Sequence, residues 1–181
     1  MRDLPMIRTY PLFLLFCILS CATRIFAGGI PGTSATFIDS EHGYSFTYPK
    51  QWQARLYRSG IVVSEVNSPN GHAGVQFRII KYNITDKTFT ANYINAIEDD
   101  LSARLLTQSQ DKIHGRQCIE LSFQAQRGGS QYYLYQLLCF IPEVSKLIII
   151  QAGCKAAEKA AVAPIIHQIS KSLVVLDPEK L

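Results

Sequence analysis

Cysteines are the residues of this sequence whose spacing says most about chemistry. Cys118 and Cys139 flank the glycine pair at 128–129, and a β-hairpin that turns between those glycines places the two cysteines directly opposite each other. A bridge between directly opposed strand residues is geometrically demanding. Two interpretations therefore stay open: a Cys118–Cys139 disulfide, or buried thiols that act as small apolar groups, with Cys154 among them. No C-x-x-C pair points to redox catalysis.

Histidines and acidic residues give weaker signals. His42, His72, His114 and His167 are scattered along the chain without the H-x-x-x-H type of spacing that predicts a metal site. The acidic run at 98–100 is typical of a solvated helix face and lacks the alternating oxygen ligands of a calcium loop. The sequence contains no G-x-S-x-G elbow, P-loop or dinucleotide glycine pattern. We therefore predict no catalytic residue, no metal ligand and no cofactor.

The first 27 residues predict an export signal. A charged start precedes the apolar stretch PLFLLFCIL at 11–19, which is too short for a permanent membrane anchor. Cleavage after Ala27 would release a free protein, whereas residues 18–21 resemble a bacterial lipobox and would make Cys21 a lipidated first residue. Residues 28–34 are expected to form a flexible lead-in. The predicted location is therefore periplasmic or secreted, or membrane-anchored through Cys21 alone, and an exported chain can form disulfides.

Composition and charge narrow the class of protein. The chain has 181 residues, 48% of them hydrophobic and 18% charged, which suits one globular domain behind an export signal. The net charge is +4. Removing residues 1–27 takes away three arginines and one aspartate, which leaves about +2. Without a run of lysines and arginines, this charge argues against a nucleic-acid partner.

Residues 116–154 predict a meander of three antiparallel strands. Each segment is rich in aromatic and β-branched residues, and breaks fall at Gly128-Gly129 and Pro142-Glu143. The hairpin register also places Ile119 opposite Leu138. The stretch 147–150 is apolar on both faces, so we expect a helix to cover each face of the sheet.

Helical segments are predicted before and after the meander. Residues 89–105 carry an apolar residue at every fourth position, which is typical of a helix face in the core. Residues 155–162 are helical by composition, and Pro164 fits the first turn of a second helix after them, with Ile165, Ile169 and Leu173 facing the sheet. Further strands are expected at 36–40, 44–48, 53–58, 61–67 and 74–82.

The element Gly43-Tyr44-Ser45-Phe46-Thr47-Tyr48-Pro49, preceded by Phe37-Ile38-Asp39 and followed by Trp52, resembles the PsbP superfamily. The order of the later elements, which ends in Ser170-Lys171-Ser172-Leu173, is also similar. The superfamily includes an extrinsic photosystem II protein, a Ran-binding import factor and DcrB-type bacterial envelope lipoproteins; this chain is closest in character to the last.

The resemblance implies an α+β fold: an α/β/α sandwich over residues 35–176 with a central antiparallel sheet, an N-terminal β-hairpin, one long helix and a C-terminal helix. Residues 177–181 would be a tail. It also implies binding or assembly instead of catalysis, although fold alone does not fix function. No ion-site, docking or Ran-contacting residue of the family can be placed on this chain.

We therefore expect an exported, non-catalytic binding or assembly domain of the bacterial cell envelope, whose partner is an envelope protein or a small ligand. Tyr44 and Trp52 would pack in the core, or with Tyr48 they would line a binding cleft beside the sheet edge. The alternatives are a secreted hydrolase or metal-dependent enzyme, and a secreted effector. Two histidines sharing a cleft with an acidic residue would favour the enzyme.

Overall fold

The computed structural model describes residues 34–57, 62–82 and 88–181. The predicted signal segment with Cys21, and residues 28–33 of the lead-in, lie outside the described residues. The strands are β1 (Ser34–Asp39), β2 (Tyr44–Pro49), β3 (Gln53–Leu56), β4 (Val62–Asn67), β5 (Ala73–Lys81), β6 (Ala103–Ile113), β7 (Arg116–Arg127), β8 (Ser130–Ile141), β9 (Lys146–Lys155) and β10 (Val174–Val175). The helices are α1 (Phe89–Leu101) and α2 (Lys159–Lys171), with short 3-10 turns at Pro142–Val144, Ala156–Glu158 and Pro178–Lys180.

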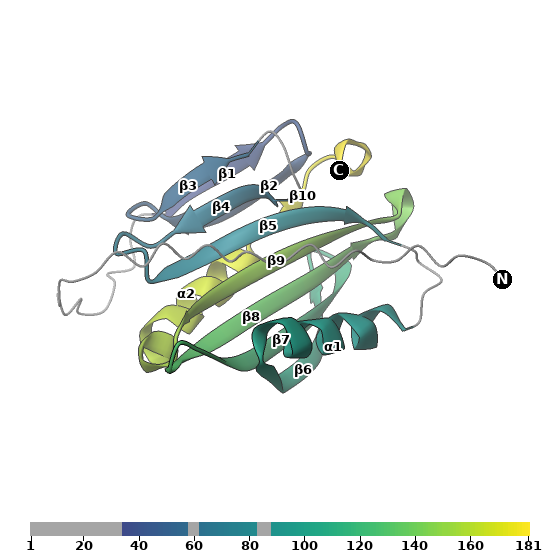
Figure 1. Ribbon diagram of the computed structural model, residues 1–181. Coiled ribbons are helices and arrows are strands. Elements are labelled where there is room, and N and C mark those ends of the chain that lie inside the picture. Colours follow the sequence, from purple (N-terminus) through teal and green to yellow (C-terminus); the bar gives the residue numbers. More distant parts are fainter. Residues whose placement is uncertain (1–33, 58–61, 83–87) are drawn as a thin grey trace.

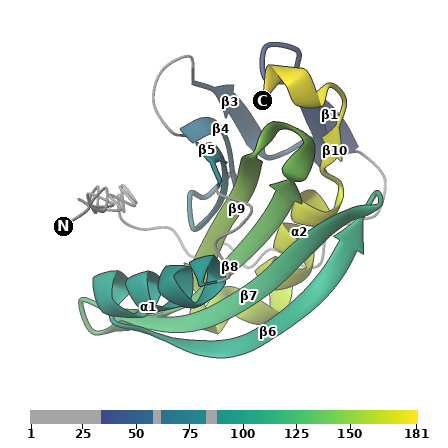
Figure 2. The same ribbon diagram turned by 90° about the vertical axis from the view of Figure 1, so that its right-hand side faces the viewer.

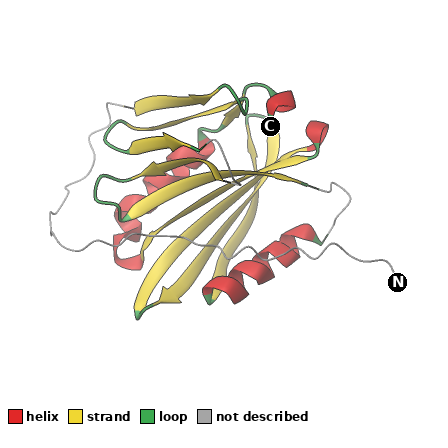
Figure 3. Cartoon of the chain, turned by 45° about the horizontal axis from the view of Figure 1, so that its top comes forward, coloured by secondary structure: helices red, strands yellow, loops and turns green. Residues whose placement is uncertain are grey.

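A seven-stranded antiparallel sheet, in the order β3-β4-β5-β9-β8-β7-β6, forms the centre of the molecule (Figure 1). A smaller sheet, β1-β2-β10, joins the N-terminal hairpin to the C-terminal strand. Figure 3 shows the long central strands with α1 and α2 beside them. The predicted α+β class with an antiparallel sheet, an N-terminal hairpin and a C-terminal helix is confirmed. No helix within the described ranges is long and apolar enough to cross a membrane.

The predicted register of the meander is confirmed. Cys118 pairs with Cys139 and Ile119 pairs with Leu138 between β7 and β8, while Cys154 of β9 lies opposite Tyr133 of β8. Gly128 and Gly129 both have positive φ angles, 56° and 77°, at the turn between β7 and β8. Glycine adopts this left-handed conformation without a steric penalty, so the turn is tight and fixes the pairing of both strands.

The two faces of the large sheet are covered by different helices, as the apolar stretch 147–150 predicts (Figure 2). On one face, Ile148 and Ile150 belong to a core that includes Ile166 and Ile169 of α2. On the other face, Leu147 and Ile149 pack in a second core that includes Ile94 and Ile97 of α1. Successive residues of β9 point to opposite faces, so one short strand supplies both cores.

Helix α1 ends earlier than the sequence predicted. Its last helical residue is Leu101, and Ser102 takes a left-handed conformation with φ 47° and ψ 46°. Leu105 instead belongs to β6, where it pairs with Phe123, and its backbone N–H donates to Glu98 Oε1 at 2.8 Å. The apolar residue at 105 continued the four-residue spacing, but it points into the same core from a strand. Sequence spacing could not distinguish these two arrangements.

The prediction for Pro164 was wrong. Pro164 lies inside α2, which begins at Lys159, and its side chain faces solvent. The helix therefore runs through the position where the sequence placed a first turn, with one backbone donor missing. This shift also changes which residues face the sheet: Ile166 is fully buried, whereas Ile165 is only partly buried. Ile169 and Leu173 are buried as predicted.

Both ends of the described chain pack against the small sheet. Ser34, predicted to be in the lead-in, is the first residue of β1 and pairs with Pro49. At the other end, the Gly43 carbonyl accepts hydrogen bonds from the backbone N–H groups of Leu176 and Asp177, at 2.7 and 3.0 Å. Gly43 has a φ of 64°, and a Cβ there would collide with the Asp177 carbonyl. The residues after 176 therefore contact the domain instead of extending from it.

Candidate binding site

The three aromatic residues proposed for a cleft lie in or against the core. Tyr44 is fully buried, and its hydroxyl donates to Ser64 Oγ at 2.8 Å. Trp52 is 5% exposed, and Tyr48 is partly buried against the same core. Core packing of Tyr44 and Trp52, one of the two interpretations, is thus what the structure shows. A cleft lined by these residues stays a prediction, and the open cavity lies elsewhere.

A cavity of about 540 Å³ opens on the side of the large sheet that α1 partly covers. The register of β5 and β9 places Gly74 directly opposite Gly153, so these two neighbouring positions carry no side chain of their own. A Cβ added to Gly74 would lie 2.6 Å from Asn67 Oδ1, and one added to Gly153 would lie 3.1 Å from a Leu134 methyl carbon. The two glycines therefore form the floor of a depression, which we call the hollow.

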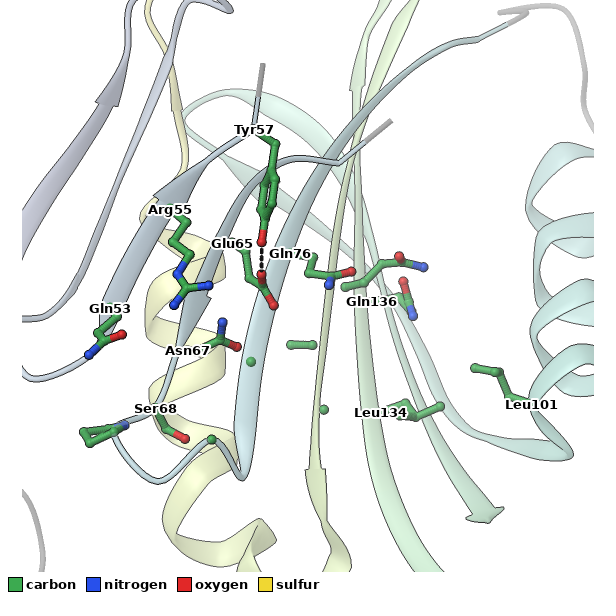
Figure 4. Close-up of a pocket in the computed structure, with 16 residues that line it drawn as sticks. Gln53, Arg55, Tyr57, Glu65, Asn67, Ser68, Gln76, Leu101, Leu134 and Gln136 are labelled. Atoms are coloured by element: carbon green, nitrogen blue, oxygen red, sulfur yellow. Dashed lines mark hydrogen bonds between the residues drawn. The ribbon is translucent and has the colours of Figure 1, made fainter. Parts of the chain in front are cut away.

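A row of polar side chains crosses five strands beside this floor. The pairings Arg55–Glu65, Glu65–Gln76, Gln76–Gln151 and Gln151–Gln136 join β3, β4, β5, β9 and β8 directly. All of these residues line the hollow, and Figure 4 shows Arg55, Glu65 and Gln76 side by side. Cross-strand neighbours lie about 5 Å apart, so one ligand can contact several of them.

Two glutamines of this row are buried and held by a hydrogen-bond network. Gln136 is 2% exposed and Gln151 is 4% exposed. Arg78 Nη1 donates to Gln151 Oε1 at 2.9 Å, Gln151 Nε2 donates to the Tyr93 hydroxyl at 3.3 Å, and that hydroxyl donates to Gln136 Oε1 at 2.9 Å. Burial raises the pKa of Tyr93 to about 12 and lowers the pKa of Arg78. The network therefore fixes the orientation of both amides.

The rim of the hollow carries its charged and aromatic groups. The Tyr57 hydroxyl donates to Glu65 Oε2 at 2.6 Å, and this bond raises the pKa of Tyr57. Among the described residues that line the hollow, Arg55 and Glu65 are the charged ones, and they are direct cross-strand partners. At the other end, Leu101 of α1 and Leu134 of β8 form an apolar wall (Figure 4).

The histidines lie apart from the hollow and do not share a cleft. Each histidine has a different neighbour. His42 Nδ1 is 2.8 Å from an Asp39 carboxylate oxygen, and His72 Nδ1 is 2.8 Å from a Glu158 carboxylate oxygen. His167 Nε2 is 3.1 Å from the Tyr133 hydroxyl, and His114 lies in the turn between β6 and β7. In the part of the chain that the structure describes, no group of three or more His, Cys, Asp and Glu side chains is placed to hold a metal ion. The enzyme alternative therefore gains no support from these residues.

Cys118 and Cys139 form a disulfide between the neighbouring strands β7 and β8, with their Cα atoms 4.3 Å apart. This is the pairing that the hairpin register allowed. Cys154 is a free, buried thiol on β9, and burial raises its pKa to about 11. All of these sulfurs lie in the core on the α2 side of the sheet, whereas the hollow opens on the α1 side.

The sequence did not predict the hollow, although two glutamines in apolar strands give one indication of it. Gln136 and Gln151 interrupt apolar strands at positions that period-2 alternation assigns to a covered face. A buried glutamine needs hydrogen-bond partners, so its presence there indicates a polar network or a ligand. Only the order of the strands showed that Gln76 and Glu65 continue the same row.

Comparison with known proteins supports the fold. No family model and no curated protein matches the sequence. The structure is similar to cyanobacterial PsbP (CyanoP) from Synechocystis sp. PCC 6803, with a TM-score of 0.62 and 17% identity over 83% of this chain and 98% of that one. It is similar to the Ran-binding protein Mog1p from Saccharomyces cerevisiae, with a TM-score of 0.60 and 7% identity over 82% of this chain and 98% of that one.

A third similar structure is LpqN from Mycobacterium tuberculosis, a protein involved in cell envelope biogenesis. Its TM-score is 0.55, with 13% identity over 82% of this chain and 87% of that one. At these identities the likeness concerns the fold and not the residues of a site. The chain therefore has a PsbP-like fold, as the sequence element around Tyr44 and Pro49 indicated.

Proposed function

We propose that this protein is an exported, non-catalytic binding domain of the bacterial cell envelope, and that its hollow is where a partner or small ligand binds. The row from Arg55 to Gln136 carries the proposal, because it gathers hydrogen-bonding groups around a floor of two glycines. Three of the five residues in the row are glutamines, whose amides neither titrate nor act as nucleophiles, so the row suits recognition better than catalysis.

The buried part of the row strengthens the proposal. The network of Arg78, Tyr93, Gln136 and Gln151 holds two amides in fixed orientations before any ligand arrives. Preorganised side chains lose less conformational entropy on binding, which favours affinity. The alternative, a secreted hydrolase or metal-dependent enzyme, would need a nucleophile and a base in contact, and no observation on the described residues favours it.

The location rests on the leader sequence and on analogy. The LpqN structure belongs to a protein involved in cell envelope biogenesis, and the Mog1p structure to a Ran-binding protein, so the fold serves both an envelope and a protein-binding role. We infer that this chain is released into the periplasm or medium after cleavage behind Ala27. The other outcome is attachment to the membrane through a lipid on Cys21.

The intact mass of the mature protein from fractionated cells tests the location. A mass that starts at Gly28 in the soluble fraction is expected. A mass that starts at Cys21 with acyl chains in the membrane fraction would establish the lipoprotein form, and an uncleaved cytosolic protein would contradict export altogether.

Photo-crosslinking in cells tests the site. A benzoylphenylalanine placed at Gln53, on the exposed rim, is expected to give a discrete adduct. The same probe at Gln108, an exposed glutamine of β6 outside the hollow, is the matched control and should give none. Gly74→Val, which fills the floor, should abolish the Gln53 adduct. Equal adducts at both positions, or an adduct that survives the filling, would contradict binding in the hollow.

A further inference from the structure

The geometry of the hollow points to a neutral saccharide as its ligand. This inference rests on the proposed function and adds the chemical class of what is bound. It depends on three observations: the hollow has balanced charge, it presents donors and acceptors on opposite sides of one floor, and it offers small apolar surfaces at both ends.

Charge comes first. Arg55 and Glu65 are the charged residues among the described lining of the hollow, and the strand register makes them direct partners. The Glu65 carboxylate also accepts a hydrogen bond from the Tyr57 hydroxyl. Opposite charges on neighbouring strands compensate each other, so the lining itself has no net charge. The guanidinium of Arg78, which donates to Gln151 Oε1, is not among the lining residues. Its other polar groups are amides and hydroxyls, which favours an uncharged ligand.

The network determines which atoms face the ligand. Arginine has no acceptor, so the Gln151 atom bonded to Arg78 must be its carbonyl oxygen, and the hydroxyl of Tyr93 must then donate to Gln136 Oε1. Each buried amide therefore uses its oxygen within the network and keeps an N–H available. The β8–β9 side of the hollow is a donor surface.

Acceptors lie on the opposite side of the floor. Asn67 Oδ1 lies close above Gly74, 2.6 Å from the place that a Cβ would take. Glu65 lies two residues before Asn67 on β4, so both side chains are on the same face of the sheet, and both line the hollow. A ligand that spans the floor can accept hydrogen bonds from the amides at one edge, and at the other edge it can donate to Asn67 and Glu65 and accept from Arg55. Hydroxyl groups do both, so a ring that carries several hydroxyls satisfies both edges in one orientation.

Apolar contacts complete the match. Leu101 and Leu134 line one end, and the ring of Tyr57, which is 37% exposed, stands at the other (Figure 4). The C–H faces of a sugar ring are apolar and can pack on such surfaces while its hydroxyls point to the amides. A cavity of about 540 Å³ is in the range of small-ligand sites and holds an oligosaccharide of a few units.

An extended peptide fits less well. Peptides that bind to sheets usually add a strand at an open edge, where backbone N–H and C=O groups are unpaired. The floor of the hollow belongs to β5 and β9, whose backbones pair with neighbours on both sides, and the edge strand β3 lies at the rim. A peptide on this floor would find side chains, and not unpaired backbone groups, as its hydrogen-bond partners.

Nuclear magnetic resonance of the ¹⁵N-labelled mature protein tests the inference. The probes are maltotriose, mannotriose, β-galactotriose and triacetylchitotriose, with trigalacturonate as an anionic comparison and N-acetyl-trialanine amide as a peptide comparison. At least one neutral saccharide should shift the side-chain NH₂ signals of Gln76, Gln136 and Gln151 in a saturable way. The Gln108 signals should not move. Gln76→Ala should weaken this binding up to about tenfold, as expected for one lost hydrogen bond, and Gln108→Ala should leave it unchanged.

Several outcomes would overturn the inference. If none of the four neutral saccharides shifts the three glutamines, or if trigalacturonate binds more tightly than all of them, a neutral saccharide is not the ligand. If only the peptide shifts these signals, the saccharide fails while binding in the hollow stands. Failure of the proposed function is separate, because it shows as a missing Gln53 adduct in cells.

Discussion

Removing the hydroxyl of Tyr93 is the sharpest test of the buried amide network. This hydroxyl lies between Gln136 and Gln151, which are 2% and 4% exposed, and it bonds to both. Tyr93→Phe keeps the ring, which stacks on Phe89 with centroids 6.0 Å apart. The substitution therefore removes two hydrogen bonds while it leaves the packing of α1 in place.

The expected loss in the free energy of unfolding depends on the buried amide groups that lose a hydrogen-bond partner. A buried acceptor or donor that loses its partner costs about 1–3 kcal/mol, and both amides lose one bond here. Because both amides line the hollow, water can replace part of the lost bonding, so we expect a total of about 1–3 kcal/mol. For a chain of this size each kcal/mol lowers Tm by roughly 2–4 °C. Urea unfolding followed by circular dichroism measures the change.

Tyr57→Phe is the matched control, since it removes a tyrosine hydroxyl from an exposed bond to Glu65. Its cost should stay within about 0.5 kcal/mol. Adding Gln136→Leu to Tyr93→Phe should recover part of the lost stability, because it removes the unpaired amide. If Tyr93→Phe costs no more than Tyr57→Phe, the network does not hold the amides and the reasoning about their orientation fails.

Further predictions concern the α2 side. Replacing Cys118 and Cys139 together by Ala should lower the free energy of unfolding by about 2–4 kcal/mol, and reductant should destabilise the wild type but not this variant; equal sensitivity of both would refute the disulfide. Because burial raises the pKa of Cys154 to about 11, iodoacetamide at pH 8 should modify it only after unfolding, and mass spectrometry of native protein that shows rapid labelling would contradict its burial. Burial lowers the pKa of His167 in the folded protein, so the unfolded chain binds its proton first: stability should fall as the pH drops below about 6.5, and His167→Gln should flatten that slope in unfolding curves between pH 7 and 5. An unchanged slope would show that His167 does not carry this linkage.

The sequence was informative where neighbouring residues decide the structure. The register of β7 and β8 follows from Gly128-Gly129, because a tight turn fixes which residues oppose each other. The apolar stretch 147–150 predicted a helix on each face, because a strand that is apolar on both sides must be covered on both. Helix boundaries were less certain: Leu105 fits the spacing of α1 and of β6 equally well.

Local sequence patterns could not predict the candidate site. Glu65, Gln76, Gln136 and Gln151 are far apart in the chain, and they form one row only because β4, β5, β9 and β8 are neighbours in that order. The sequence by itself determined the antiparallel meander and placed Cys118 opposite Cys139, since turns and alternation act between near neighbours; the export signal stays a prediction. The tertiary structure alone decided where glycines meet across strands and which amides share a face, because those contacts depend on strand order, which no local pattern encodes.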